Sequence, residues 1–346
     1  MSAVPPVSIV GFAGCTSLGY SLAPTLAAMG AGLNNFTDTG LKSPFGTSVM
    51  GASLLDRDLP RMERLRVMTS IALVDLQDLL TAAGSEQAPL MLGVASDLDD
   101  GEEAALRAQL ARSPIIPRET AWFPYGRASA FSALAGALSL LERGPHPFIV
   151  VGGIDSLCGP HTVHRLVQFG RTLGPHTEGT IPGEAAVFAL LARADHPAAD
   201  PVSTVVLEAV AQHRSPMAFT QRDRVSGDDL ATVFRAFRER GSQRVDRVIA
   251  AHSGEGYFGH SFSYAYLREV EIMPEPLEVE LIADSVGDVG AAAGVLGLAL
   301  ATYRMATQAR GARQRALVYS ESDTGEMGAA IVEGAPSAWQ LRTDAA

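Results

Sequence analysis

One stretch, residues 122–156, constrains the fold more than any other. Within it, Gly126 opens a run of small and apolar residues that continues to Leu141. A Gly-Pro turn then leads to Phe148–Val151, which predicts a buried strand. A helix that is apolar on nearly every side must lie inside the protein, with other elements packed around it. We therefore expect an α/β protein with this helix at its centre. Its buried N-terminus is a place where enzymes put a nucleophile or bind an anion.

Composition narrows the class of protein. The chain has 346 residues, of which 47% are hydrophobic and 19% charged, so a large part of it is expected to be buried in the fold or in a subunit interface. The net charge of -11 argues against nucleic acid and anionic membrane as partners, because both attract basic surfaces. The two cysteines, Cys15 and Cys158, are too few for a disulfide framework and fit a reducing cytoplasm.

Several local patterns are explained without a ligand. The apolar start of the chain lacks a basic region and is broken by Gly and Pro, so it predicts a strand, Val7–Phe12, rather than a signal peptide. The Gly11–Gly19 segment fits neither dinucleotide nor P-loop spacing. The acidic run 96–103 does not match a calcium loop, and the histidines lack zinc-ligand spacing. We expect no cofactor, no metal and no membrane span.

The pattern of strands and helices restarts at Pro201. This predicts two similar halves, residues 1–200 and residues 201–346, each with strands around a small-residue helix. The second such helix is expected over Gly287–Tyr303. Its start, Gly287-Asp288, echoes Gly126-Arg127, since each is a glycine and a charged residue before a run of Ala and Gly. If the halves are related by a pseudo-twofold axis, both helix N-termini can face one shared site.

Three segments carry a resemblance to a family. The central helix followed by Gly152–Ser156, the segment His252–Gly256 after a predicted strand, and Gly287–Gly294 are similar to the corresponding parts of β-ketoacyl synthases of the thiolase superfamily. Glu184 lies in a turn that also resembles that family, where the glutamate is usually structural. The resemblance covers nearly the whole chain. It implies an α/β, five-layer αβαβα thiolase-like fold built from two similar halves.

The same resemblance implies that most of the family's chemistry is missing. It places Arg127 at the position of the catalytic cysteine, His252 at that of the first histidine and Asp288 at that of the second. The lysine that commonly precedes the last motif is absent, and residues 322–326 replace a Gly-Phe-Gly-Gly turn. A guanidinium cannot accept an acyl group, and a carboxylate repels an enolate or a malonyl group. Condensation and malonyl decarboxylation are both disfavoured.

The two replaced positions can compensate each other. We expect Arg127 and Asp288 to meet as a bidentate ion pair that fills the site, because buried charges seldom go unpaired. Two alternatives stay open: both side chains are exposed, or Arg127 binds an anionic ligand such as a carboxylate or a phosphopantetheine phosphate. His252 can equally be a satisfied core residue, and Cys158 is best explained as a small buried filler.

These considerations favour a catalytically degenerate synthase-like protein, acting as a scaffold, a partner subunit or an adaptor. The alternatives are an acyltransferase or ketosynthase of unusual mechanism, using His252 and Ser129 as nucleophile, and a ligand-binding sensor. By resemblance we expect a homodimer, or a heterodimer with a related subunit, that pairs through the strand at Pro147–Gly152. An acyl carrier protein and a secreted effector are further candidate partners.

Overall fold

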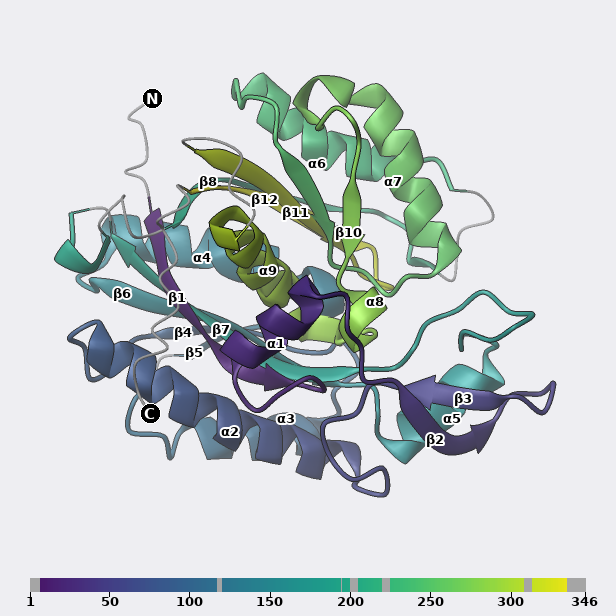
Figure 1. The fold of residues 1–346 in the computed structure, drawn as a ribbon. Coiled ribbons are helices and arrows are strands. Elements are labelled where there is room, and N and C mark those ends of the chain that lie inside the picture. Colours follow the sequence, from purple (N-terminus) through teal and green to yellow (C-terminus); the bar gives the residue numbers. More distant parts are fainter. Residues whose placement is uncertain are drawn as a thin grey trace.

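The computed structural model describes residues 7–116, 120–193, 195–199, 205–219, 225–307 and 313–334. Ten strands form one large sheet, in the order β10-β9-β11-β12-β8-β1-β7-β6-β4-β5 (Figure 1). The strands are β1 (Val7–Thr16), β4 (Leu90–Gly93), β5 (Thr120–Phe123), β6 (Phe148–Ser156), β7 (Glu184–Arg193), β8 (Val205–Arg214), β9 (Arg247–Ala250), β10 (Val279–Leu281), β11 (Gln314–Glu321) and β12 (Glu326–Gly334).

The sheet consists of two five-stranded halves with the same topology. In the first half, β7 is antiparallel to β1 and β6, while β6, β4 and β5 are parallel to one another. In the second half, β12 is antiparallel to β8 and β11, while β11, β9 and β10 are parallel. Strands β1 and β8 join the halves over a short antiparallel pairing, from Val7 opposite Leu207 to Ile9 opposite Val205. The predicted boundary between residues 200 and 201 lies outside the described residues.

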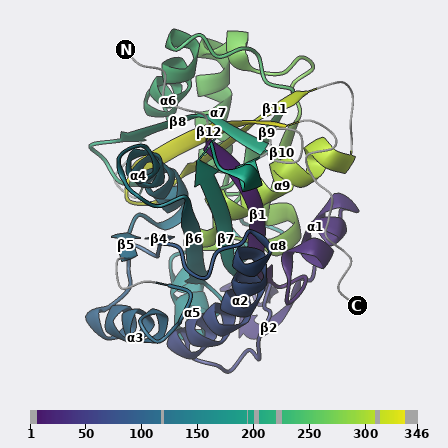
Figure 2. The ribbon, with the colours of Figure 1, turned by 90° about the vertical axis from the view of Figure 1, so that its left-hand side faces the viewer.

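Helices complete the layers. Figures 1 and 2 place α2 (Arg61–Ala82) and α3 (Asp100–Leu110) outside the first half-sheet, and α6 (Asp228–Glu239) and α7 (Gly256–Arg268) outside the second. Two further helices, α4 (Ser129–Arg143) and α9 (Ala293–Thr307), lie between the half-sheets. The result is the expected five-layer αβαβα fold, with helices outside and between two half-sheets.

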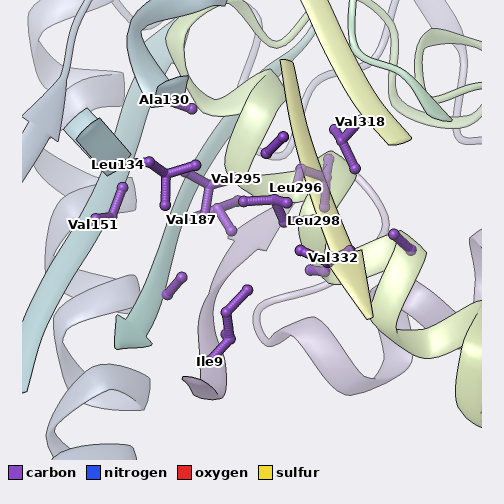
Figure 3. Close-up of a cluster of buried hydrophobic side chains, with 14 of the residues drawn as sticks. Ile9, Ala130, Leu134, Val151, Val187, Val295, Leu296, Leu298, Val318 and Val332 are labelled. Carbon is purple, nitrogen blue, oxygen red and sulfur yellow. The ribbon is translucent and has the colours of Figure 1, made fainter. Parts of the chain in front are cut away.

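The central layer is the largest apolar cluster of the described protein. Figure 3 shows part of it, where Leu134 of α4 and Leu296 of α9 lie among strand residues such as Val187 and Val332. A Cβ atom built on Gly294 would lie 2.5 Å from the Cβ of Ala130, so small residues let α4 and α9 approach closely. Every residue of α9 from Ala293 to Thr302 is buried, as its sequence without a polar face predicts.

Smaller elements cover the rest. The hairpin of β2 (Thr37–Lys42) and β3 (Ser48–Gly51) and the helix α5 (Pro160–Gln168) project from the main body in Figure 1. Within the described ranges, no helix is long and apolar enough to cross a membrane. The smaller elements are α1 (Leu22–Gly30), β2 (Thr37–Lys42), β3 (Ser48–Gly51), η1 (Gly126–Ala128), α5 (Pro160–Gln168), η2 (Pro197–Ala199), η4 (Val270–Ile272), α8 (Ala283–Val286) and η5 (Gly290–Ala292).

The structure corrects two sequence predictions. The second central helix does not begin at Gly287: that residue has φ +68°, and α9 starts at Ala293 after the short turn η5. The strand expected at a subunit interface, Pro147–Gly152, falls largely in β6, which is paired with β4 on one side and β7 on the other. It therefore has no free edge. Among the described strands, β5 forms the outer edge of the first half-sheet.

Candidate functional site

The inner ends of α4 and α9 have the same backbone design. A short turn precedes each helix, and each turn starts with a left-handed glycine: Gly126 with φ +57° and Gly290 with φ +51°. In backbone conformation Gly126 corresponds to Gly290 and not to Gly287. The sequence similarity between Gly126-Arg127 and Gly287-Asp288 therefore pairs positions that differ by three residues in the structure. Asp288 lies in the loop before the turn. Its backbone N–H donates to Ile181 O at 2.7 Å, which fixes that loop.

Arg127 and Asp288 meet between these two helix ends. Arg127 Nη1 donates to Asp288 Oδ2 at 2.8 Å, and the residues are only 6% and 2% exposed. The pair is not bidentate, because Asp288 Oδ1 accepts the Gly290 N–H at 3.0 Å instead. Arg127 Nε donates to Glu321 O at 3.0 Å, and its Nη2 donates to Asp323. The expected pair is present, and the alternative in which both side chains are exposed is wrong.

The pair belongs to a longer network of alternating charge. Arg171 donates from Nη1 to Asp323 Oδ2 at 2.6 Å and contacts both oxygens of Glu255 at 2.8 and 2.6 Å. The contacts therefore run from Asp288 through Arg127, Asp323 and Arg171 to Glu255. The arginines come from the first half of the chain and the carboxylates from the second. Sequence reasoning missed Arg171, which lies in the loop after α5 and carries no recognisable motif.

Burial and neighbouring charge act in opposite directions on these groups. Burial raises the pKa of the Asp288 carboxyl, and the adjacent Arg127 opposes that shift. Burial also disfavours the charged form of Asp323, but the two arginines outweigh it and hold the pKa of that carboxyl well below its usual range. Burial opposes the charge of Arg127, yet Asp323 and Asp288 raise the pKa of its guanidinium. Arg127 is therefore a permanent cation.

His252 lies close to the network, just after β9. Burial and the nearby charge of Arg127 lower the pKa of its imidazole to about 3. Its Nδ1 accepts the N–H of Gly254 at 3.1 Å, which suits the neutral ring. The ring centre lies 5.7 Å from that of Phe258 and 5.8 Å from that of Tyr319. At neutral pH the imidazole is uncharged and packed among aromatic rings.

Comparison with known proteins identifies the fold. No protein-family model and no curated protein matches the sequence. Among solved structures, the ishigamide ketosynthase/chain length factor has a TM-score of 0.75 at 15% identity, over 96% of this chain and 100% of the other. The oxazolomycin ketosynthase domain of Streptomyces albus has 0.72 at 16% identity, over 95% and 75% of the chains. A ketosynthase in complex with its chain length factor from Xenorhabdus doucetiae has 0.68 at 15% identity, over 96% and 98%.

The chain has the thiolase-like fold of ketosynthases and chain length factors. The assignment of Arg127, His252 and Asp288 to catalytic positions stays a prediction from the sequence, and the geometry brings Arg127 and Asp288 into contact. Arg127 also places a charge 4.8 Å from the ring centre of Phe258, a cation–π arrangement. Each nitrogen of the Arg127 guanidinium donates to an acceptor within the protein, so three of its five N–H groups are already bound.

Among the described residues around this site, no serine or cysteine has the contacts of an activated nucleophile. Ser129 is buried, and its hydroxyl bonds to main-chain groups only: it donates to Phe123 O at 2.8 Å and accepts from Tyr125 N–H at 3.1 Å. Both thiols are buried elsewhere. Burial raises the pKa of Cys15 to about 12 and also raises that of Cys158, whose Sγ lies against the carbonyls of Ala52 and Pro182.

A surface hollow of about 270 Å³ lies beside the inner end of α4. Ser132 Oγ donates to Gln212 Oε1 at 2.7 Å, while the next residue of β8, His213, lies 3.2 Å from Asp229 of α6. Since adjacent strand residues point to opposite faces, Ser132 and His213 do not form a nucleophile–base couple. The hollow is lined by Tyr125, Ser132, Gln212, His213, Arg214, Glu326 and Met327.

The other candidate groups are structural. Glu184 accepts from Arg64 Nη1 at 3.0 and 2.9 Å and from the backbone N–H of Leu54 and Leu55, and both charged side chains are fully buried. This arrangement fits the structural role expected of Glu184. In the part of the chain that the structure describes, no cluster of three or more His, Cys, Asp or Glu side chains could hold a metal ion.

Proposed function

We propose that this chain is a non-catalytic, ketosynthase-like partner subunit. The observation that carries the proposal is the occupancy of the site: a fixed guanidinium at the resemblance's cysteine position, bound on three sides by Asp288, Asp323 and the Glu321 carbonyl. A guanidinium is not an acyl acceptor. Because Arg127 itself occupies the position where the resemblance expects the cysteine, that position has no thiolate to receive an acyl group. The Asp288 carboxylate, where the resemblance expects a histidine, opposes the negative charge of an enolate.

Assembly with a ketosynthase is supported by two features. Solved neighbours include a ketosynthase in complex with its chain length factor and a ketosynthase/chain length factor. Among the described strands, none pairs with the outer edge of β5, and the adjacent face of α4 is half-buried, including Ala135, Gly136 and Leu138. Edge strands offer main-chain partners to another subunit. We infer a heterodimer through β5 and α4, with an acyl carrier protein engaging the assembled pair.

Two of the earlier alternatives have little support. The bonds of Ser129 to main-chain groups leave it without a base, and the internal bonds of Arg127 leave no obvious place for an anionic ligand. A homodimer, a secreted-effector partner and a cytoplasmic location stay predictions from the sequence.

Two measurements test the function. The purified chain is incubated with acetyl-CoA, malonyl-CoA and acylated carrier protein, and the intact mass and any released CO2 are recorded beside a catalytic ketosynthase. We expect no acyl adduct and no decarboxylation. The R127C/D288H variant places a cysteine and a histidine at the two replaced positions, and an acyl adduct on it would show that the substrate can enter the site. An adduct on the native chain that is lost in S129A contradicts the proposal and favours an acyltransferase.

The partner is tested by coexpression with a catalytic ketosynthase of the source organism, followed by native mass spectrometry. We expect a 1:1 complex that A135E disrupts, because it puts a carboxylate on the half-buried face of α4. The matched control is A104E on the exposed surface of α3. A complex equally tolerant of both substitutions, or no complex with any ketosynthase, contradicts the pairing.

A further inference from the structure

The outer part of the charge network is covered by two segments that are far apart in the sequence. One is the loop 169–180, which carries Arg171. The other is the segment 215–219 after β8, which carries Phe219. Its ends are tied to the turn between β11 and β12, since Ser215 N–H donates to Gly325 O at 2.9 Å and Phe219 N–H donates to Asp323 O at 2.7 Å.

Side chains from these segments stack over the site in a fixed order. Arg171 lies 4.9 Å from the ring centre of Phe219, which stacks on Phe258 at 5.4 Å with an interplanar angle of 23°. Arg127 lies 4.8 Å from the ring centre of Phe258. Each arginine therefore stacks on a ring, the two rings stack on each other, and Asp323 binds both arginines. This column runs from the buried end of α4 outward.

Arg171 is the outer of the two arginines in the column, and its partner Asp323 is the more exposed member of their ion pair, with 35% of its side chain exposed. The Arg171 side chain is 20% exposed, against 7% for Arg127, and it is the group that joins the loop 169–180 to Asp323 and Glu255. The loop has its own tie to the second half, because Thr180 Oγ1 donates to Ser253 O at 2.8 Å. Partly exposed ion pairs are weaker than buried ones, so the Arg171 contacts are the part of the network that opens at least cost.

We propose that Arg171 is the latch of a cover over the candidate site. With Arg171 bound to Asp323 and Glu255, the loop 169–180 and the segment 215–219 close over the Arg127–Asp288 pair. Release of Arg171 removes the outer layer of the column and admits solvent and solutes to the inner end of α4. The latch is a property of this chain's geometry and holds whether or not the site carries out chemistry.

The test measures access to the inner site rather than activity. S322C places a thiol at a residue that is 5% exposed and whose hydroxyl accepts the Ala128 N–H at 2.8 Å. The native thiols, Cys15 and Cys158, are both buried, which keeps background labelling low. Iodoacetamide labelling is timed in S322C, in S322C/R171M and in S322C/R165M. Arg165 is a matched control, since it pairs with Asp97 at the surface and its side chain is 44% exposed.

We expect R171M to speed labelling about ten-fold, because the labelling rate follows the open population, and R165M to leave it unchanged. Hydrogen exchange of the Ser215 and Phe219 amides, in chains without the added cysteine, is expected to rise in R171M while β6 and β7 stay protected. Equal labelling rates in S322C and S322C/R171M overturn the proposal. A rise in the labelling rate of S322C/R165M as large as that of S322C/R171M also overturns it. If R171M does not fold, R171K replaces it, and a rate unchanged from S322C again overturns the proposal.

Discussion

Arg127 Nη1 lies 2.8 Å from Asp288 Oδ2, at the point where the two central helices of the fold begin. The contact joins residues that are 161 positions apart and that come from different halves of the chain. It is also the inner end of a network that reaches the surface at Arg171 and Asp323. The energetics of this pair, the low pKa of His252 beside it, the packing of β6 near it and the burial of the two thiols lead to four predictions.

The first prediction concerns the stability that the pair provides. R127M leaves Asp288 buried without its counter-charge and is expected to lower the free energy of unfolding by about 3–5 kcal/mol. D288L is expected to cost less than R127M, because Arg127 keeps its bond to Asp323. The double variant R127M/D288L should cost less than the sum of the two single variants by about 1–3 kcal/mol, because Asp288 is then not left without its counter-charge. Urea unfolding at neutral pH measures all three. Additive effects of the two substitutions would contradict the coupling.

The second prediction concerns acid. The pKa of His252 is about 3 when folded, below its usual value near 6.5, so the unfolded chain binds the extra proton first. Its contribution to stability is present above about pH 6.5 and is lost as the pH falls toward the folded pKa, at about 1.4 kcal/mol per pH unit. H252N keeps an acceptor for Gly254 N–H and should reduce this slope. H161N, on an exposed face of α5, is the control and should leave it unchanged.

The third prediction concerns the close approach of β6 to η5. A Cβ on Gly153 would lie 2.1 Å from the carbonyl oxygen of Ala291, a backbone atom that cannot move alone. We expect G153A to lower the free energy of unfolding by about 3 kcal/mol through overpacking. Gly259 in α7 has no atom within 4 Å of such a Cβ, so G259A should be neutral or stabilise by up to about 1 kcal/mol. Chemical denaturation of both variants tests the contrast, and equal losses would refute it.

The fourth prediction concerns the thiols. Cys15 and Cys158 are unpaired and buried, and burial raises the pKa of each thiol, so both should be slow to react with Ellman's reagent in the native protein. Two thiols should become reactive together when the chain unfolds in urea. Rapid native reaction of either cysteine, identified with C15S and C158S, would mean that a thiol is exposed and would reopen the search for a nucleophile.

Much of the architecture could be predicted from local patterns. Runs without polar residues predicted the two central helices and most strands of the large sheet, because burial leaves a direct mark on composition. Element boundaries follow less directly from composition: the pattern predicts helix over Gly287 to Ala292, yet the left-handed glycines Gly287 and Gly290 place a loop and a turn there. The sequence predicts subunit pairing through the strand at Pro147–Gly152, yet that strand, β6, lies inside the sheet and β5 lies at its edge. Composition does not reveal the order of strands in a sheet.

The sequence by itself determined which chemical groups stand at the inner helix ends. Arg127 cannot become a nucleophile whatever surrounds it, and Asp288 carries a carboxyl group in any fold. Only the tertiary structure decided how these groups are paired, including the unforeseen bridges through Asp323 and Arg171. The physical reason is that hydrophobic periodicity reports how deeply each segment is buried, while ion-pair partners are chosen by how distant segments pack against one another.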